Sequence, residues 1–389
     1  MKNIKNIIYL HPHFTLPWWA WNFALETAKQ LANKGYRIFI ISWKQDEDLI
    51  EKYKWKNMNF IEVKMPLSSS FYFWIGFIIW YIKVSKKIKF ITNNNDWEFI
   101  LFPQVFPANW WWLMYKLFNK KTKTMFMCHE PSAFIHNDKW IDSIGNPIKR
   151  FVAKYNYVLK FLDKYLVSKS DIIIANSWFS KIEIEKLYNK PVSHILYPWF
   201  DENRFKINKS LKKENYIWIL SRLTKFKNID FVIDVFADFV KNNKDFLLKI
   251  AWEWEYKENL EEKVKKMNLS KNVIFLWRLS DEELIPFYQK AKLISFPSVW
   301  EPFGMVPIEA MACGTIVVWH NSWWLKETIN PEFRYDNKEW LLDLLNKVIN
   351  LDTYDLSYIN KFTWENTVNS FVEDILYNID EIITNNIVK

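Results

Sequence analysis

The sequence predicts an α/β protein with two doubly wound parallel sheets, and three observations carry this prediction. Short apolar runs alternate with amphipathic segments along most of the 389 residues, as expected for strands that helices cover on both faces. The alternation stops in a polar, lysine-rich stretch at 198–214 and then restarts. The length suits two domains of about 190 residues each.

The first half of the chain supplies the strands of one sheet. Residues 4–10 form an apolar run that is typical of a buried strand, and a helix is expected at 22–33, where Gly35 would end it in the C′ position. Further strands are expected at 36–42, 99–102, 124–128, 172–175 and 194–197. Helical segments lie between them.

The second half repeats this pattern. Strands are expected at 216–220, 246–250, 273–276, 293–296 and 315–318, and helices at 228–240, 257–267, 281–289 and 304–313. One last amphipathic helix is expected at 365–383. Ligands of open α/β sheets bind beyond the carboxyl ends of the strands, so two such domains facing each other are expected to form a ligand cleft.

The charge of the chain fits several partners. The net charge of +9 comes from lysines that are spread along the sequence. It fits attraction to phosphate-bearing substrates or an anionic membrane surface, and it fits solvated helix faces equally well. Nucleic-acid binding would need a basic stripe on a recognisable module, and we recognise none. The apolar-then-basic segment at 71–87 would allow weak peripheral attachment to a membrane.

Cysteine and histidine give no metal site. Two cysteines cannot build a disulfide framework or a four-cysteine zinc site. His11 and His13 lie at the end of the first expected strand, but two ligands without a third are a weak signal. We therefore predict neither a metal nor another cofactor.

Glycine is abnormally rare and tryptophan abnormally common. The chain has 5 glycines and 24 tryptophans, and the two together would be an ordinary glycine content of roughly 7%. Pairs such as Trp18-Trp19 and Trp323-Trp324 fall in turn-like segments, where positive φ or close backbone approach favours glycine. We hypothesise that UGA codons for glycine have been read as tryptophan. The alternative is a protein that is genuinely rich in tryptophan.

The most informative segment runs from Ser298 to Gly314. Glu301 is expected in a loop after a strand, Gly304 permits a tight turn into a helix, and Glu309 lies about one turn into that helix. Free backbone N–H groups at a helix start suit an anion or sugar hydroxyls. Carboxylates are good acceptors for the hydroxyls of sugars and ribose. The alternative is an acidic loop followed by an ordinary surface helix.

This segment resembles the Glu-x7-Glu signature of the GT-B retaining glycosyltransferases of family 4, the group 1 glycosyl transferases. The resemblance implies two Rossmann-like domains facing a cleft, with the acceptor on the first and a nucleotide sugar on the second. It also implies that Glu309 binds the nucleotide ribose. Glu301 would contact the donor sugar, helped by the backbone of Phe303, Gly304 and Met305.

Two cations resemble the family's Gly-Arg-Leu…Lys-Gly segment. Arg222 and Lys227 would neutralise the donor diphosphate, because a leaving nucleoside diphosphate gains negative charge. Ser221 and Asn228 stand where the family usually has glycine. Taken alone, an arginine and a lysine at this spacing would be ordinary surface charges.

Three loops resemble other nucleotide-binding parts of the family. Arg278 and Leu279 match the loop whose backbone meets the base, and 321–327 matches a Gly-Gly-x-x-Glu segment near the donor phosphates. Trp18 and Trp19 match the glycine-rich loop after the first strand, which would bring backbone N–H groups to the donor phosphates or the acceptor. Bulky residues forced into positive φ there would cost roughly 1–3 kcal/mol each.

His129 resembles the N-domain histidine of the family, which points into the cleft near the donor sugar. A lone histidine at the end of a strand can instead be structural. A nucleophilic pair with Cys128 is not expected, because adjacent strand residues point to opposite faces. Residues 175–180 resemble the family's Asn-Ser-x-x-Ser segment, a capped helix start that is structural or lines the acceptor side.

We therefore expect a retaining hexosyltransferase that uses a nucleotide-diphosphate sugar, no metal, and a glycan or lipid-linked acceptor. The first domain would span 1–198, joined by a C-terminal helix from about 364–389 that packs back on it, and the second 199–363. No secretory leader is recognisable, so we expect a cytoplasmic enzyme that acts in cell-envelope polysaccharide synthesis and can be peripheral on the inner membrane face. The alternatives are a GT-B nucleotide-sugar epimerase or hydrolase, and a non-catalytic basic protein of the membrane surface.

Overall fold

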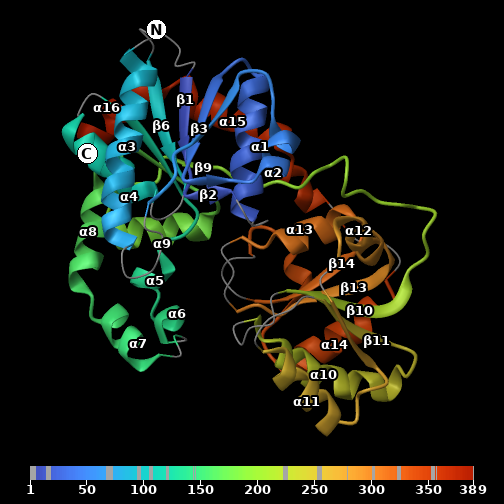
Figure 1. The fold of residues 1–389 in the computed structure, drawn as a ribbon. Coiled ribbons are helices and arrows are strands. Elements are labelled where there is room, and N and C mark those ends of the chain that lie inside the picture. Colours follow the sequence, from blue (N-terminus) through green and yellow to red (C-terminus); the bar gives the residue numbers. More distant parts are fainter. Residues whose placement is uncertain are drawn as a thin grey trace. The chain divides into compact units, whose positions relative to one another are not determined.

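The computed structural model divides the chain into two compact units (Figure 1). Unit 1 consists of Met1–Tyr197 and Val368–Lys389, and unit 2 of Pro198–Thr367. The structure describes residues 6–14, 19–66, 73–93, 98–104, 108–119, 122–142, 144, 146–221, 227–251, 256–277, 279–299, 303–321, 326–351, 355 and 357–388.

Unit 1 is built on a seven-stranded parallel sheet in the order β5-β3-β1-β6-β7-β8-β9. Its strands are β1 (Asn6–Leu10), β3 (Arg37–Ser42), β5 (Met58–Glu62), β6 (Phe99–Pro103), β7 (Lys123–Cys128), β8 (Ile172–Ala175) and β9 (His194–Ile195). Every residue of β1 and β8 is buried, because helices cover both faces of the sheet. Two short strands, β2 (His13–Phe14) and β4 (Lys44–Gln45), pair with each other beside it.

Helices lie on both faces of this sheet (Figure 1). Helix α1 (Trp19–Asn33) covers one face, while α3 (Phe73–Asn93), α4 (Ala108–Phe118), α8 (Tyr157–Ser168) and α9 (Trp178–Tyr188) share a buried apolar cluster with the other. The remaining helices of the first segment are α2 (Glu47–Tyr53), α5 (Ala133–His136), α6 (Asp138–Asp142) and α7 (Pro147–Lys154).

Helix α3 explains the apolar run in its first half. Phe77, Trp80 and Val84 are spaced three or four residues apart and are fully buried against the sheet. The segment expected to touch a membrane buries this side, whereas Ile75, Ile78 and Ile82 of the same helix are 47–58% exposed. No helix in the described part of the chain is long and apolar enough to cross a bilayer.

The C-terminal segment belongs to unit 1. In place of one helix at 365–383, the structure has α15 (Trp364–Phe371), a π-helical turn η5 (Val372–Leu376) and α16 (Ile379–Val388). The Phe371 ring stacks on Phe102 of β6 at 5.9 Å between centroids, and Asp380 forms an ion pair with Lys123 of β7 at 2.6 Å. The end of the chain thus packs on the sheet that the first half builds.

Unit 2 holds a six-stranded parallel sheet in the order β12-β11-β10-β13-β14-β15. Its strands are β10 (Glu214–Leu220), β11 (Leu247–Ala251), β12 (Val273–Leu276), β13 (Ala291–Phe296), β14 (Ile316–His320) and β15 (Arg334–Tyr335). Its helices are α10 (Ile229–Asn242), α11 (Lys257–Lys266), α12 (Asp281–Lys290), α13 (Met305–Ala312) and α14 (Lys338–Val348), with the 3-10 turns η3 (Pro331–Phe333) and η4 (Ser357–Phe362).

The predicted α/β class with two doubly wound parallel sheets is confirmed. Helix α1 begins three residues before the expected start. The strands β2, β4, β5 and β15, the helix α14 and the turns η3 and η4 were not predicted from the sequence.

Candidate active site

The first part of the site lies at the carboxyl edge of the unit 2 sheet. Strand β10 lies between β11 and β13, so the order of connections reverses between β10 and β13, and ligands of such sheets bind at this point. Lys227 follows β10 and Ser298 follows β13. The Lys227 Nζ donates to the Ser298 Oγ over 3.5 Å, which places one cation across the switch point.

The backbone beside Lys227 explains a departure from the family pattern. Asn228 occupies the N-cap position of α10 without a side-chain capping hydrogen bond and has φ +53°, in the left-handed region. Glycine adopts this conformation freely, and asparagine is one of the few other residues that tolerate it. The family's glycine can therefore be replaced by asparagine here without moving the lysine.

Glu309 is held by a tyrosine that sequence reasoning missed. The buried Tyr288 on α12 donates its hydroxyl to the Glu309 Oε2 over 2.8 Å. Burial, and then the negative charge of Glu309, raise the pKa of Tyr288 well above its usual range, so the phenol remains a proton donor. No motif points to Tyr288, because the contact joins residues on two different helices.

The start of α13 is arranged as the motif predicts. Gly304 has φ +85° and is buried, so a side chain there would be strained. Among the described residues no side chain caps α13, and its first-turn N–H groups can face a ligand. Phe303 is buried edge-on against Phe362 at 5.5 Å, and Met305 is half-buried. Any contact from Phe303 to a ligand is thus left to its backbone.

Several expected site residues lie outside the described residues. These are Arg222, Arg278, Glu301 and Trp18. Leu279 is half-buried in the loop between β12 and α12, next to Ser280, which caps α12 in a capping box with Glu283. The structure therefore brings together Lys227, Ser298 and the start of α13 with Glu309 around the strands β10 and β13 of unit 2.

His129 occupies the corresponding edge of the unit 1 sheet, directly after β7. Its side chain is 5% exposed, and burial lowers its pKa to about 3. The Phe23 ring of α1 meets it edge-on at 5.3 Å. At neutral pH the imidazole is uncharged, so it can exchange hydrogen bonds with sugar hydroxyls but cannot neutralise a phosphate.

The Asn-Ser-x-x-Ser segment fixes the backbone of His129. Ser177 caps α9 and accepts from the Ser180 backbone N–H over 3.0 Å. The Ser180 Oγ donates to the His129 carbonyl over 2.9 Å. Both serines are buried, so this segment is structural and also positions a candidate site residue.

The two tryptophans at the start of α1 do not show the backbone strain that positive φ would cause. Trp19 and Trp21 have helical backbone within α1. Among the described residues, every non-glycine residue with positive φ is an asparagine: Asn57, Asn189, Asn228 and Asn268. Positive φ at Trp19, one of the reasons for reading it as glycine, is therefore wrong.

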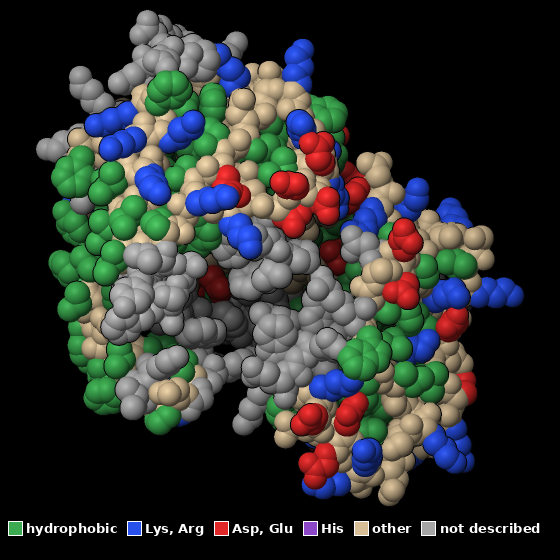
Figure 2. Space-filling view, in the orientation of Figure 1, with side chains coloured by type: hydrophobic (Ala, Val, Ile, Leu, Met, Phe, Trp, Pro, Cys, Tyr) green, Lys and Arg blue, Asp and Glu red, His purple; other side chains and the backbone are tan. Residues whose placement is uncertain are grey.

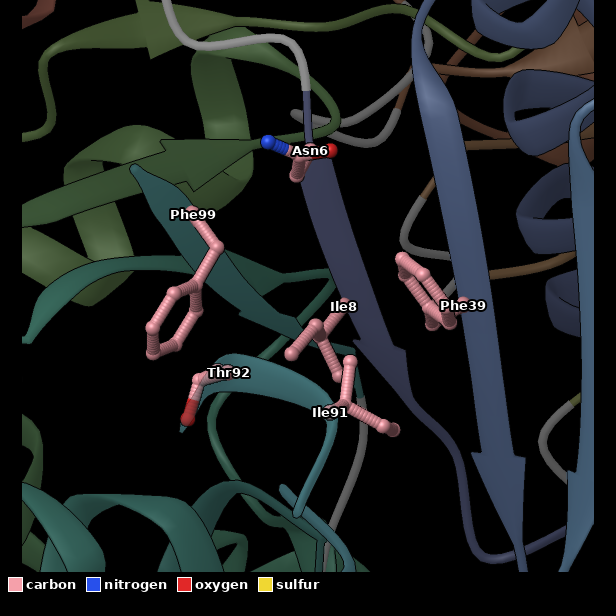
Figure 3. Close-up of a pocket in the computed structure, with 6 residues that line it drawn as sticks. All are labelled: Asn6, Ile8, Phe39, Ile91, Thr92 and Phe99. Atoms are coloured by element: carbon pink, nitrogen blue, oxygen red, sulfur yellow. The ribbon is translucent and has the colours of Figure 1, made fainter. Parts of the chain in front are cut away.

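Unit 1 also contains a hollow, whose lining residues are labelled in Figure 3. It is lined mainly by apolar side chains of the sheet and the end of α3, including Ile8, Phe39 and Ile91. Asn6 and Phe99 in its wall are the first residues of β1 and β6, so it lies toward the amino ends of these strands. The Asn6 side-chain N–H donates to the Glu98 carbonyl at 2.9 Å, so it already has a partner within the protein. We therefore interpret the hollow as a gap in the packing of unit 1 and not as a binding site.

Most of unit 2 matches a known protein family. Residues 200–355 match the family described as glycosyl transferases group 1. The chain is 27% identical over 239 residues to the O-antigen chain mannosyltransferase RfbU of Salmonella typhimurium, covering 59% of this chain and 65% of that protein. It is 24% identical over 285 residues to the D-inositol 3-phosphate glycosyltransferase of Corynebacterium urealyticum, covering 62% and 67%. The chain thus spans about two thirds of the length of these relatives.

A solved structure shares the whole fold. Anabaena Alr3699/HepE in complex with UDP and glucose superposes with a TM-score of 0.67 at 16% identity, and the match covers 99% of each chain. This likeness shows the fold class of two parallel-sheet α/β domains, GT-B. Residues 200–355 therefore match the glycosyl transferases group 1 family, within a chain of GT-B fold.

Proposed function

We propose that the protein is a retaining glycosyltransferase of family 4 that moves a hexose from a nucleotide-diphosphate sugar to a glycan or lipid-linked acceptor. The observation that carries the proposal is the cluster in unit 2. A lysine bridges the switch point through Ser298. Glu309 lies on α13, the helix that follows Gly304, and its carboxylate accepts a hydrogen bond from Tyr288. A cation and the N–H groups of a helix start suit the diphosphate of a nucleotide, and a carboxylate suits the hydroxyls of its ribose.

Each group has a role in the transfer. The bond from the anomeric carbon to the diphosphate breaks, a bond to the acceptor oxygen forms, and the acceptor hydroxyl gives up its proton. Lys227, with Arg222, stabilises the charge that gathers on the leaving diphosphate. Glu309 accepts hydrogen bonds from the ribose hydroxyls, and Glu301 holds the donor sugar. These assignments rest on the family resemblance and, for Lys227 and Glu309, on the contacts described above.

We assign His129 to the sugar and not to the diphosphate. The low pKa of about 3 keeps the imidazole neutral, which suits hydroxyl groups. We also propose that the backbone of Leu279 and Arg278 meets the base, and that the segment with Trp18 and Trp19 meets the donor phosphates or the acceptor.

The named relatives suggest which donors to try first. RfbU is called a mannosyltransferase, and Alr3699/HepE was solved with UDP and glucose. We propose a nucleotide-linked hexose as donor, in the cytoplasm where such donors are made, and transfer without a metal because Lys227 and Arg222 can neutralise the diphosphate. Transfer should therefore persist in EDTA.

We also propose that a subset of the tryptophans is glycine in the active protein. Trp218 in β10 and Trp319 in β14 are fully buried, yet their indole N–H groups find no acceptor among the described residues. Trp80 and Trp111 are equally buried and donate to the carbonyls of Val63 and Tyr81 over 2.7 and 3.0 Å. A buried donor without a partner costs about 1–3 kcal/mol, so native proteins rarely keep one.

The codons test this sorting directly. We expect UGA at positions 218 and 319 and UGG at 80 and 111 in the genomic sequence. Mass spectrometry of the protein from its native host should show glycine at 218 and 319. UGG at both positions would overturn this sorting, and UGG at positions 18, 19, 323 and 324 would overturn the recoding itself.

A donor and product experiment tests the function. The full chain, made with the residues that the native host inserts, is incubated with UDP-, GDP- and ADP-linked hexoses, with and without acceptor glycans. NMR of the product reports the anomeric configuration, and retention is expected. Sugar release or an epimerised nucleotide sugar without acceptor would instead favour the epimerase or hydrolase alternative.

A further inference from the structure

The outer face of α7 and α8 exposes an unusual number of large apolar side chains. Phe151, Val152, Tyr155, Tyr157, Val158 and Phe161 are each between 49% and 69% exposed. We call these six residues the α7–α8 face. In Figure 2, hydrophobic side chains line the edge of unit 1 over α8. Contiguous apolar patches of this kind mark interaction surfaces.

The opposite side of α8 already has its partners. Leu166 and Val167 are buried in the core of unit 1. Asp163 is fully buried and accepts hydrogen bonds from Trp110 and Tyr188. Helix α8 is thereby fixed in rotation, and its part of the α7–α8 face is held outward by the fold.

The rings of the face are arranged in advance. Phe151 and Tyr155 lie 4.8 Å apart between centroids, and Tyr155 and Tyr157 lie 6.5 Å apart. Tyrosines combine an apolar ring with a polar tip, which suits the boundary between lipid headgroups and acyl chains. A surface of this kind can enter the headgroup layer without first reorganising.

Charge identifies the occupant. Within 146–169, every charged side chain that the structure describes at the surface is a cation: Arg150, Lys154, Lys160, Lys164 and Lys169. The acid in this range, Asp163, is buried, and Asp142 before it pairs with Lys154 at 3.6 Å. A second copy of the chain would bring the same cations into repulsion. An anionic bilayer complements both the rings and the charges.

We propose that the α7–α8 face docks unit 1 on an anionic lipid bilayer. The rings enter the headgroup region, while the lysines beside them contact lipid phosphates. This surface contains no tryptophan, so it does not depend on how the tryptophan codons are read. It is also independent of the proposed transfer reaction, since neither nucleotide nor acceptor takes part.

Vesicle flotation of the full chain tests the proposal. Phosphatidylcholine vesicles with about one third phosphatidylglycerol are compared with pure phosphatidylcholine vesicles. The variant Tyr157→Ser/Phe161→Ser removes two rings, and Lys154→Gln/Lys164→Gln removes two charges. The matched control is Ile274→Ser/Tyr377→Ser, which removes two apolar side chains that are 37% and 53% exposed elsewhere. Circular dichroism confirms that each variant is folded.

We expect binding to the anionic vesicles, weakened about tenfold or more by the ring variant and by the charge variant, and unchanged in the control. About 0.5 M NaCl should release the bound chain. Three results would overturn the proposal: no binding by the folded parent chain, an equal loss in the control, or concentration-dependent dimerisation that the ring variant abolishes without vesicle binding.

Discussion

Tyr288 shows how a single hydroxyl outside any motif can set the geometry of a motif residue. It is fully buried, meets the Phe205 ring at 6.0 Å between centroids, and donates to Glu309. The glutamate is half-buried, so the direction of its carboxylate depends on this donor. Lys227 is similarly tied to Ser298. At the scale of residues, the candidate site consists of motif side chains, one of which is held by a partner, Tyr288, that no motif identifies.

Tyr288→Phe should therefore weaken nucleotide-sugar binding without unfolding unit 2. A hydrogen bond to a charged group contributes about 1.5–3 kcal/mol, so affinity should fall about tenfold or more. Calorimetric titration measures this change. Tyr216→Phe is the matched control, because its hydroxyl donates to the Phe287 carbonyl at 2.7 Å and not to Glu309. Equal affinity losses in both variants would contradict the assignment.

His129 should make the stability of the protein fall in acid. Its pKa is lowered to about 3 in the folded chain, while the unfolded histidine takes a proton below about 6.5. Between these values the unfolded state binds more protons, so the free energy of unfolding decreases as the pH falls.

His129→Phe removes this penalty. The free energy of unfolding of the variant minus that of the parent chain should be about 2 kcal/mol larger at pH 5 than at pH 7.5. Urea unfolding at the two pH values measures the gain. An unchanged difference would mean that His129 titrates normally in the folded chain.

At the scale of elements, the loop after β7 is positioned by the start of α9. Ser180 lies one turn into this helix and reaches back to the carbonyl of His129. Its own backbone N–H is capped by Ser177, so the helix start and the loop form one hydrogen-bonded unit. The imidazole is thus positioned by the loop after β7 together with helix α9, which follows the neighbouring strand β8.

Ser180→Ala should destabilise this unit. The buried carbonyl loses its Ser180 donor, at a cost of about 1–3 kcal/mol in unfolding free energy, and Ser180→Thr should recover most of it. Chemical denaturation measures both. Ser168→Ala is the control, because its Oγ bonds the Tyr165 carbonyl at 2.7 Å on an exposed helix end, and it should change stability by less than about 0.5 kcal/mol. A loss for Ser180→Ala no larger than that of the control would exclude the role.

The long apolar elements could be predicted from the sequence, and the short or amphipathic ones could not. Strands such as β1 and β8 are uniformly apolar because both faces are buried. Strand β5 mixes buried and exposed residues, and β15 has two residues, so neither leaves a clear apolar run. The motif glutamate and lysine were found because their segments resemble the family pattern, whereas Tyr288 and Ser180 act through contacts that only tertiary structure creates.

At the scale of the whole molecule, the chain leaves unit 1 after Tyr197 and returns to it at Val368. The returning segment buries Phe371, Val372 and Ile375 almost completely. Asn386 donates to the Asp171 carbonyl at 3.1 Å near the start of β8. Unit 1 is therefore completed by residues that follow unit 2 in the sequence.

Truncation after Thr367 should unfold unit 1 and spare unit 2. Each buried apolar side chain contributes about 1.5–3 kcal/mol, and several are lost against a typical total stability of about 5–15 kcal/mol. Hydrogen exchange should show lost protection in β1 and β8 and retained protection in β10 and β13. Unchanged protection in unit 1 would show that the returning segment is dispensable.

We propose that unit 2 binds a nucleotide-linked sugar through Lys227 and Glu309. Calorimetric titration of the full chain with UDP-, GDP- and ADP-linked hexoses tests it most directly. We predict saturable binding of one donor, with an affinity that is about tenfold or more lower in Lys227→Ala and in Glu309→Ala. No measurable affinity for any of these donors, or affinity that both variants leave intact, would contradict the account.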